Sequence, residues 1–215
     1  MTAILRGRSN WLVLTLITLG GTLSGVAAKV ADESAITGMA DLGTSPTVWV
    51  LALALIARFA PPRVNAAIRA AAFFTAMCIG YYAWTSLVLG YPGSGPLLVG
   101  WVAIALTVIP VGAALIRWSC GRSGVLAAAV LAGAGGVALS DQRVLQLWYA
   151  AAGQLPSKFP LRPIQGLIGI ATALVITLWV PRHHATRAWA AALLLPMTYI
   201  AMTALDAARG RLLPS

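Results

Sequence analysis

Seven long apolar runs, separated by short polar breaks, constrain this chain more than any other feature of its sequence. Most of them reach the roughly 17 to 25 residues that a helix needs to cross a hydrocarbon core of about 30 Å. A helix also pairs its own backbone N–H and C=O groups, and lipid offers these groups no other hydrogen-bond partner. The pattern predicts an all-α, polytopic transmembrane helix bundle of about seven spans, in a single integral membrane domain over residues 1–215. The expected spans cover about residues 11–28, 46–60, 65–89, 96–117, 124–140, 164–181 and 187–206.

Charge content supports this class of protein. Charged residues make up 9% of the chain, whereas a soluble domain carries about 25%. The chain has a formal net charge of +10, but its arginines punctuate the apolar runs instead of clustering on a separate domain. This distribution argues against nucleic acid as a partner and favours the acidic head groups of membrane lipids.

The distribution of basic residues also predicts an orientation. Arg6 and Arg8 precede the first apolar run, and Val26-Ala27-Ala28 ends it, as in a signal peptide. Because the run is longer than the usual 7 to 15 residues of such a signal, we expect a span. With the N-terminus inside, nine basic residues fall on the inner side, while six basic and all five acidic residues fall outside. Since basic residues favour the cytoplasmic side, the expected location is a bacterial cytoplasmic membrane with the C-terminus outside.

One polar stretch, residues 141–153, is too short to span. Its apolar side chains recur at helical spacing, with Asp141 placed to cap its start and Gly153 its end. Trp148 and Tyr149 would lie at head-group level. We therefore expect one interfacial helix on the outer leaflet.

Small residues mark where helices would approach one another. Gly21 and Gly25 lie one turn apart in the first run, and residues 124–140 consist almost wholly of alanine, glycine, valine and leucine. Helix association in lipid depends on close packing, which small residues permit. The fifth run is expected at the centre of the bundle; the alternative is a lipid-facing position.

Acidic residues gather in one segment, residues 29–49. It holds Asp32, Glu33 and Asp41, beside Lys29. The following run is short, about 22 Å at a rise of 1.5 Å per residue, so the segment before it is expected to dip below the membrane surface. Three interpretations compete: a solvated loop with a Lys29–Glu33 ion pair, a vestibule for a cationic or zwitterionic solute, and acid–base chemistry on a lipid-like substrate. Metal binding is a fourth, weaker alternative.

Aromatic residues cluster at the outer end of the third run. Tyr81, Tyr82, Trp84 and Tyr91 fit an ordinary aromatic belt. However, Tyr81 and Tyr82 point about 100° apart on a helix, so one hydroxyl is expected to turn inward and need a partner. The candidate partners are Asp41, Thr44 and Ser45, the polar residues just before the run at 46–60.

Several kinds of chemistry lack support. His183 and His184 lie in an inner turn without an acid, and the acids lie on the outer side, which argues against a zinc site or a Ser-His-Asp triad. No nucleotide-binding loop, zinc-protease motif or nucleophile elbow is present. Cys78 and Cys120 are expected to be unpaired thiols. We assign no catalytic residue, no metal ligand and no cofactor.

Residues 42–84 resemble an uncharacterised family of small bacterial membrane proteins. The matching residues are Ser45, Trp49, Arg63, Gly80, Tyr81 and Tyr82, whereas Thr44 stands where an asparagine is expected. The resemblance covers about a fifth of the chain. Because that family has no assigned activity, it implies a compact helical membrane domain and no particular chemistry.

The sequence therefore favours an integral membrane protein that binds or transports a small solute or lipid-like molecule. The alternatives are a non-catalytic accessory subunit of a larger membrane complex and, more weakly, a membrane-embedded enzyme acting at the outer interface. Partners beyond lipid would be another membrane subunit or a second copy of the chain. The candidate ligand-binding residues are Lys29, Asp32, Glu33, Asp41, Ser45, Trp49, Tyr81 and Tyr82.

Overall fold

Most of the described residues are helical in the computed structural model. Its backbone is described for residues 2–34, 36, 38–40, 45–60, 62–91, 95–154 and 163–212, and its side chains for those residues except 2–9, 142 and 208–212. Every element within the described residues is helical, which confirms the all-α class. The elements are α1 (Thr2–Asp32), α3 (Pro46–Phe59), α4 (Arg63–Leu87), α5 (Gly95–Cys120), α6 (Val125–Leu139), α7 (Gln142–Ala151), α8 (Pro163–Leu174), the π-helix η1 (Val175–Trp179) and α9 (His184–Leu212).

Four of these helices are long and apolar enough to cross a membrane. They contain Asn10–Asp32, Arg63–Leu87, Gly95–Cys120 and His184–Ala207. A fifth span is reached if α6 and the following Arg143–Ala151, bent by 73°, count as one broken span. The seven expected spans are not supported by helix length, because Pro46–Phe59 and Pro163–Trp179 are shorter. Prolines bound both of these helices, and 14 residues cover only about 21 Å at 1.5 Å per residue.

The helices group into two compact units. The first comprises Met1–Thr44 and Phe59–Ala114, and therefore holds α1, α4 and most of α5. The second comprises Ser45–Arg58 and Leu115–Ser215, and therefore holds α3, the end of α5 and all later helices. The single membrane domain expected from the sequence stays a prediction.

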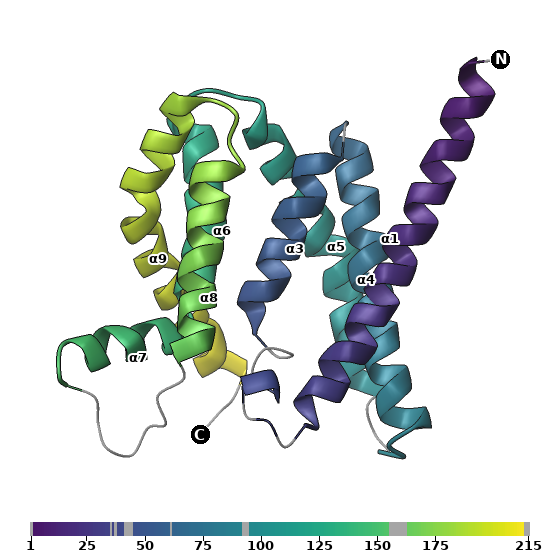
Figure 1. Ribbon diagram of the computed structural model, residues 1–215, viewed down its shortest axis with the longest axis horizontal. Coiled ribbons are helices and arrows are strands. Elements are labelled where there is room, and N and C mark those ends of the chain that lie inside the picture. Colours follow the sequence, from purple (N-terminus) through teal and green to yellow (C-terminus); the bar gives the residue numbers. More distant parts are fainter. Residues whose placement is uncertain are drawn as a thin grey trace. The chain divides into compact units, whose positions relative to one another are not determined.

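In the first unit, α1 and α4 lie side by side and run in the same direction (Figure 1). Gly21 faces the backbone of Phe73, and Gly25, one turn later, faces that of Met77. Gly80 of α4 faces Thr22 of α1 in return. A Cβ atom at any of these glycines would collide with backbone of the other helix, so the predicted Gly21-x-x-x-Gly25 contact is present and brings the two backbones together.

In the second unit, α6 is the central helix. Its buried residues include Leu131, which is fully enclosed. Gly135 and Gly136 face Leu194 and Met197 of α9, and α8 packs against α6 from another direction, with Ala173 beside Gly135. The small residues of α6 thus contact helices of its own unit, as expected for a helix inside a bundle (Figure 1).

Helix directions within the second unit follow from these contacts. Thr186, at the start of α9, lies near Arg122 just before α6, and Met197 lies near Gly136, so α6 and α9 are parallel. By contrast, Gly169 of α8 lies near Ala138 at the end of α6, so α8 runs the opposite way. The parallel pair α6 and α9, together with the antiparallel α8 packed on α6, therefore makes up the core of this unit.

The short helix predicted at residues 141–153 is present as α7. The Asp141 carboxylate accepts a hydrogen bond from the backbone N–H of Arg143 at 3.1 Å and caps the start. Gly153 follows the end with a φ of +68°, the left-handed conformation that favours glycine. α7 packs on α8 where Leu147 contacts Gly166. An interfacial position for α7 stays a prediction.

Adjacent glycines provide a test of the α1–α4 contact. Gly21→Ala should lower the melting temperature in detergent, because its Cβ would overlap the Phe73 carbonyl, and overpacking costs about 1–3 kcal/mol. Gly20→Ala is the matched control: no atom lies within 4 Å of its Cβ position, and alanine has the higher helix propensity. Equal shifts in the two variants would contradict the close contact.

Candidate functional site

A buried lysine lies where α1 ends against α4. Lys29 occupies the last turn of α1 and is 7% exposed. Lysine is almost never this buried unless it is paired. Gly25, one turn earlier on the same helix face, brings the α1 backbone against Met77 and Tyr81 of α4. The glycine contact therefore sets the position of the lysine amine.

Two carboxylates from the same turn neutralise this amine. Lys29 Nζ donates to Glu33 Oε1 at 2.6 Å and to Asp32 Oδ2 at 3.4 Å. The spacings of three and four residues place all three side chains on one side of the helix end. The side chain of Lys29 is 9% exposed, whereas those of Asp32 and Glu33 are 28% and 37% exposed. The positive charge is therefore buried and the negative charges reach the surface.

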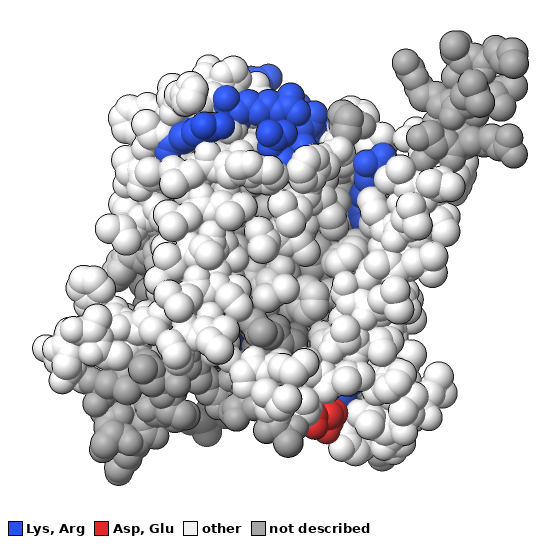
Figure 2. All heavy atoms as spheres, in the orientation of Figure 1, with Lys and Arg blue, Asp and Glu red and all other residues white. Residues whose placement is uncertain are grey.

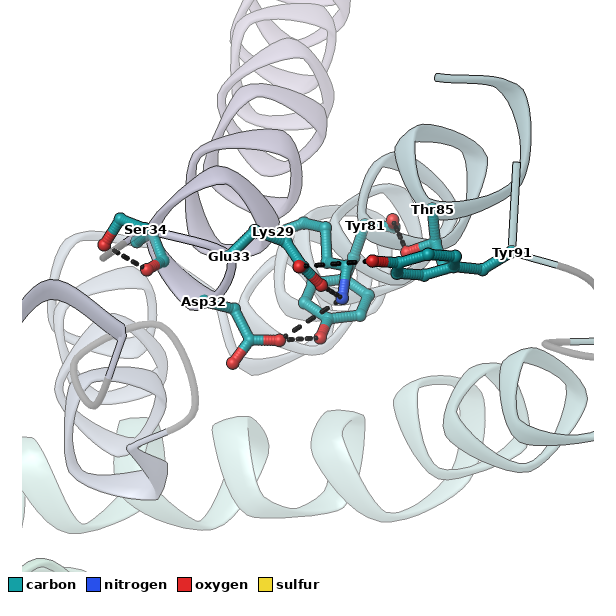
Figure 3. A network of polar contacts seen from close by, with 8 residues as sticks. Lys29, Asp32, Glu33, Ser34, Tyr81, Thr85 and Tyr91 are labelled. Atoms are coloured by element: carbon teal, nitrogen blue, oxygen red, sulfur yellow. Dashed lines mark hydrogen bonds and ion pairs between the residues drawn. The ribbon is translucent and has the colours of Figure 1, made fainter. Parts of the chain in front are cut away.

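Two tyrosines complete the cluster (Figure 3). Tyr81 Oη donates to Asp32 Oδ2 at 2.8 Å, and Tyr91 Oη donates to Glu33 Oε2 at 3.5 Å. The Lys29 amine also lies 5.3 Å and 5.7 Å from the centres of the Tyr81 and Tyr91 rings, within the range of a cation–π interaction. We call these five residues the Lys29 network: Lys29, Asp32, Glu33, Tyr81 and Tyr91.

The turn after α4 places Tyr91. Gly90 adopts a φ of +68°, and the backbone N–H of Tyr91 donates to the carbonyl of Thr85 at 3.1 Å. A glycine in this conformation ends a helix and reverses the chain. The reversal brings the Tyr91 ring back beside Lys29 (Figure 3).

The Lys29 network has an excess of negative charge. One ammonium group faces two carboxylates, so the ionised set sums to −1. The second carboxylate oxygen of Asp32 points away from Lys29 and Tyr81 (Figure 3). Acidic side chains on this face of the molecule form one small patch (Figure 2). The arrangement can attract a cation, or orient the ammonium group of a zwitterion.

The structure brings together four of the residues selected from the sequence, Lys29, Asp32, Glu33 and Tyr81. Tyr82 adjoins them through an edge-to-face ring contact with Tyr81, with centroids 5.2 Å apart. Ser45 and Trp49 belong to the other compact unit. Asp41 lies outside the described residues.

Two details differ from the sequence analysis. The inward tyrosine hydroxyl is that of Tyr81, and its partner is Asp32; of the partners expected, Ser45 lies in the other unit, and Asp41 and Thr44 lie outside the described residues. The sequence placed Tyr91 only in the aromatic cluster and did not predict its contact with Lys29 and Glu33. Gly90 could have indicated this contact, because a glycine just past a helix reverses the chain. The expected Lys29–Glu33 pair is confirmed.

Other candidate chemistry is sparse in the described part of the chain. Its residues contain no group of three or more His, Cys, Asp or Glu side chains that could hold a metal ion. His183 is exposed, and its Nε2 lies 3.4 Å from the Gly121 carbonyl oxygen. Cys78 and Cys120 are both buried and free, as expected.

An all-helical fold with four or five candidate spans indicates a helical membrane protein. The chain belongs to DUF6518, a family of unknown function, whose family model matches residues 5–210. This match confirms the expectation of a family without an assigned activity. Searches of curated proteins and of solved structures found no match.

Removing the lysine tests what the Lys29 network contributes to stability. Lys29→Gln leaves Asp32 and Glu33 facing each other without a counter-charge. Breaking a fully buried pair costs about 3–5 kcal/mol; because these carboxylates are partly exposed, we expect a loss of about 1–2 kcal/mol. Arg69→Gln is the control, since it removes a positive charge from α4 of the same unit. Denaturant unfolding in detergent should separate the two variants, and equal stabilities would contradict the structural role.

Proposed function

We propose that this protein is an integral membrane protein that binds a small cationic or zwitterionic solute, or a lipid-like molecule with such a head group, at the Lys29 network. One observation carries the proposal: the network buries its ammonium group while two carboxylates stay accessible. If the network only joined α1 to α4, one carboxylate would suffice to balance the lysine. The second leaves a charge that a positively charged group can balance.

The aromatic rings support the same ligand class. Tyr81 and Tyr91 already lie against the Lys29 ammonium, and Tyr82 adds a further ring beside Tyr81. Rings of this kind attract ammonium groups through their electron-rich faces. A bound cation would meet the carboxylates with its charge and the rings with its alkyl groups. We propose in addition that the protein transports the bound molecule across the membrane.

We further propose that the chain crosses the membrane seven times, with its N-terminus in the cytoplasm. The parallel arrangement of α1 and α4 supports this. α1 ends and α4 begins at opposite ends of that pair, so the chain between them, which holds α3, must travel back along its length. The parallel pair of α6 and α9 requires the same of α8 and η1. Both short helices would then act as spans. A helix shorter than the hydrocarbon core is tolerated where the bilayer thins around it, and the backbone beyond its ends is tolerated where protein buries it.

The same orientation would put the Lys29 network at the outer surface, since it lies where α1 and α4 end. The alternative, an accessory subunit of a larger membrane complex, is favoured by the exposed apolar face of α9. Leu195, Tyr199 and Ile200 are 75%, 70% and 54% exposed. Either lipid or another subunit, including a second copy of the chain, would cover these side chains.

Choline, a quaternary ammonium probe, and glycine betaine, a zwitterionic one, test binding at the Lys29 network. In titration calorimetry with detergent-solubilised protein, Asp32→Asn and Glu33→Gln should each weaken binding about tenfold, since a charged contact contributes about 1.5–3 kcal/mol. Asp206→Asn, at an exposed carboxylate of the other unit, should leave binding unchanged. Binding unaffected by either network variant would overturn the proposal. Unaltered binding by Asp41→Asn would remove that residue from the site.

Single-cysteine labelling tests the crossing of α3. In a Cys78→Ala, Cys120→Ala background, Ser34→Cys should react with a membrane-impermeant thiol reagent in intact cells. Arg63→Cys should react only after the cells are opened, because the two positions flank α3. Labelling of both from the same side would show that α3 does not cross. Labelling of Arg63→Cys alone in intact cells would reverse the orientation.

A further inference from the structure

Arginine side chains from separate segments gather at one end of the second unit. Figure 2 shows basic side chains collected over the ends of α6, α8 and α9. We call this set the arginine cluster. It comprises Arg58 at the end of α3, Arg117 in the last turn of α5, Arg122 in the turn before α6, and Arg182 and Arg187 around the turn between η1 and α9.

Hydrogen bonds to backbone hold these segments together. Arg117 Nη1 donates to the Arg58 carbonyl at 3.4 Å, and the backbone N–H of Arg182 donates to the Cys120 carbonyl at 3.3 Å. Arg58, Arg117 and Arg182 all lie near enough to the buried Cys120 thiol for their charges to act on it. Three chain segments thus deliver positive charge around one fully enclosed side chain.

Aromatic rings and carbonyls orient several of the guanidinium groups. Arg58 lies over the Trp179 ring at 5.5 Å, and Arg122 lies over the Trp118 ring at 5.2 Å. Arg187 Nε donates to a backbone carbonyl at 3.1 Å. A planar guanidinium fixed in this way keeps further N–H groups available, in the fork geometry that matches phosphate oxygens.

Four arginines of the cluster form no ion pair with a described carboxylate. Lys29 in the first unit and Arg143 beside α7 form ion pairs with carboxylates of their own segments. Arg117, Arg122, Arg182 and Arg187 pair with no described carboxylate. Arg122 and Arg182 are moreover exposed. Like charges held this close repel one another, and an anionic group bound among them would remove that cost.

An exposed apolar face leads along α8 and η1 to this cluster. Its residues recur every three or four positions, so they lie on one side of the helix. They are Leu167, Ile170, Leu174 and Leu178, which are 59%, 37%, 46% and 44% exposed. The face ends at Trp179, which is 48% exposed and contacts Arg58. From Leu167 to Leu178 it extends about 16 Å at 1.5 Å per residue, close to the hydrocarbon depth of one leaflet.

We propose that the arginine cluster binds the phosphate of an anionic phospholipid whose acyl chain lies along the exposed face of α8 and η1. The apolar face selects a lipid over a soluble phosphate. The absence of a described carboxylate in the cluster disfavours a zwitterionic head group, whose ammonium would meet only positive charge. This site is separate from the Lys29 network and does not rest on the function proposed there.

Lipid retention by the full-length protein tests this site. The protein is extracted in detergent micelles that contain equal phosphatidylglycerol and phosphatidylcholine, and its bound lipids are measured by native mass spectrometry. The wild type should retain phosphatidylglycerol preferentially. Arg122→Gln combined with Arg182→Gln should reduce that retention about tenfold or more, since each basic residue near an anionic lipid contributes roughly a fivefold factor. Both side chains are exposed, so the fold should be kept.

One control and one replacement variant accompany this experiment. Arg143→Gln removes one positive charge from α7, which packs on the opposite end of α8, and should leave retention unchanged. If the double variant does not fold, as judged by its melting temperature, Arg182→Gln alone replaces it. Equal loss in Arg143→Gln, or equal retention of the two lipids by the wild type, would overturn the proposal.

Soluble glycerol 3-phosphate separates a lipid from a free phosphate. At the concentration of the lipid, it should not displace bound phosphatidylglycerol, because it lacks the acyl chain. Leu174→Gln combined with Leu178→Gln should reduce lipid retention and leave any weak binding of glycerol 3-phosphate unchanged. Displacement by glycerol 3-phosphate at equal concentration, together with unchanged retention in this variant, would overturn the assignment to a lipid.

Discussion

Close contact between parallel helices, at glycines that lack a Cβ atom, is the interaction on which both compact units depend. In lipid, apolar side chains gain little by leaving their surroundings, so helices associate through backbone proximity and polar contacts. Gly21, Gly25 and Gly80 allow this between α1 and α4, and Gly136 allows it between α6 and α9. A side chain at any of these positions would collide with the facing backbone.

The glycine contact also explains how a lysine can be buried at the end of α1. An unpaired ammonium group in an apolar setting is costly, so its neighbours must be supplied by the fold. Asp32 and Glu33 come from the same turn, but Tyr81 reaches Asp32 only because Gly25 lets α4 approach. Packing and electrostatics are therefore coupled at this point: a change that separated the helices would also expose the charge.

Helix class and several local contacts were predictable from sequence, whereas span count and site membership were only partly so. The Lys29–Glu33 pair and the Asp141 cap follow from spacing within one helix. The partner of Tyr81 depends on the register between two helices far apart in sequence, which periodicity does not specify. The shortness of the run at residues 46–60 was predictable, and its helix has 14 residues; hydropathy does not specify whether so short a helix crosses the membrane.

The parallel pairing of α1 and α4 has a consequence for how the protein is made. The two helices are separated by a connection of about 30 residues that includes α3, so α1 emerges from the ribosome well before its partner. Until α4 has been synthesised, the Gly21–Gly25 face of α1 and the Lys29 ammonium have no α4 to contact. Before that point, the Lys29 charge is balanced only by Asp32 and Glu33 of the same helix. The first unit is complete only after Tyr81 and Tyr91 have been synthesised.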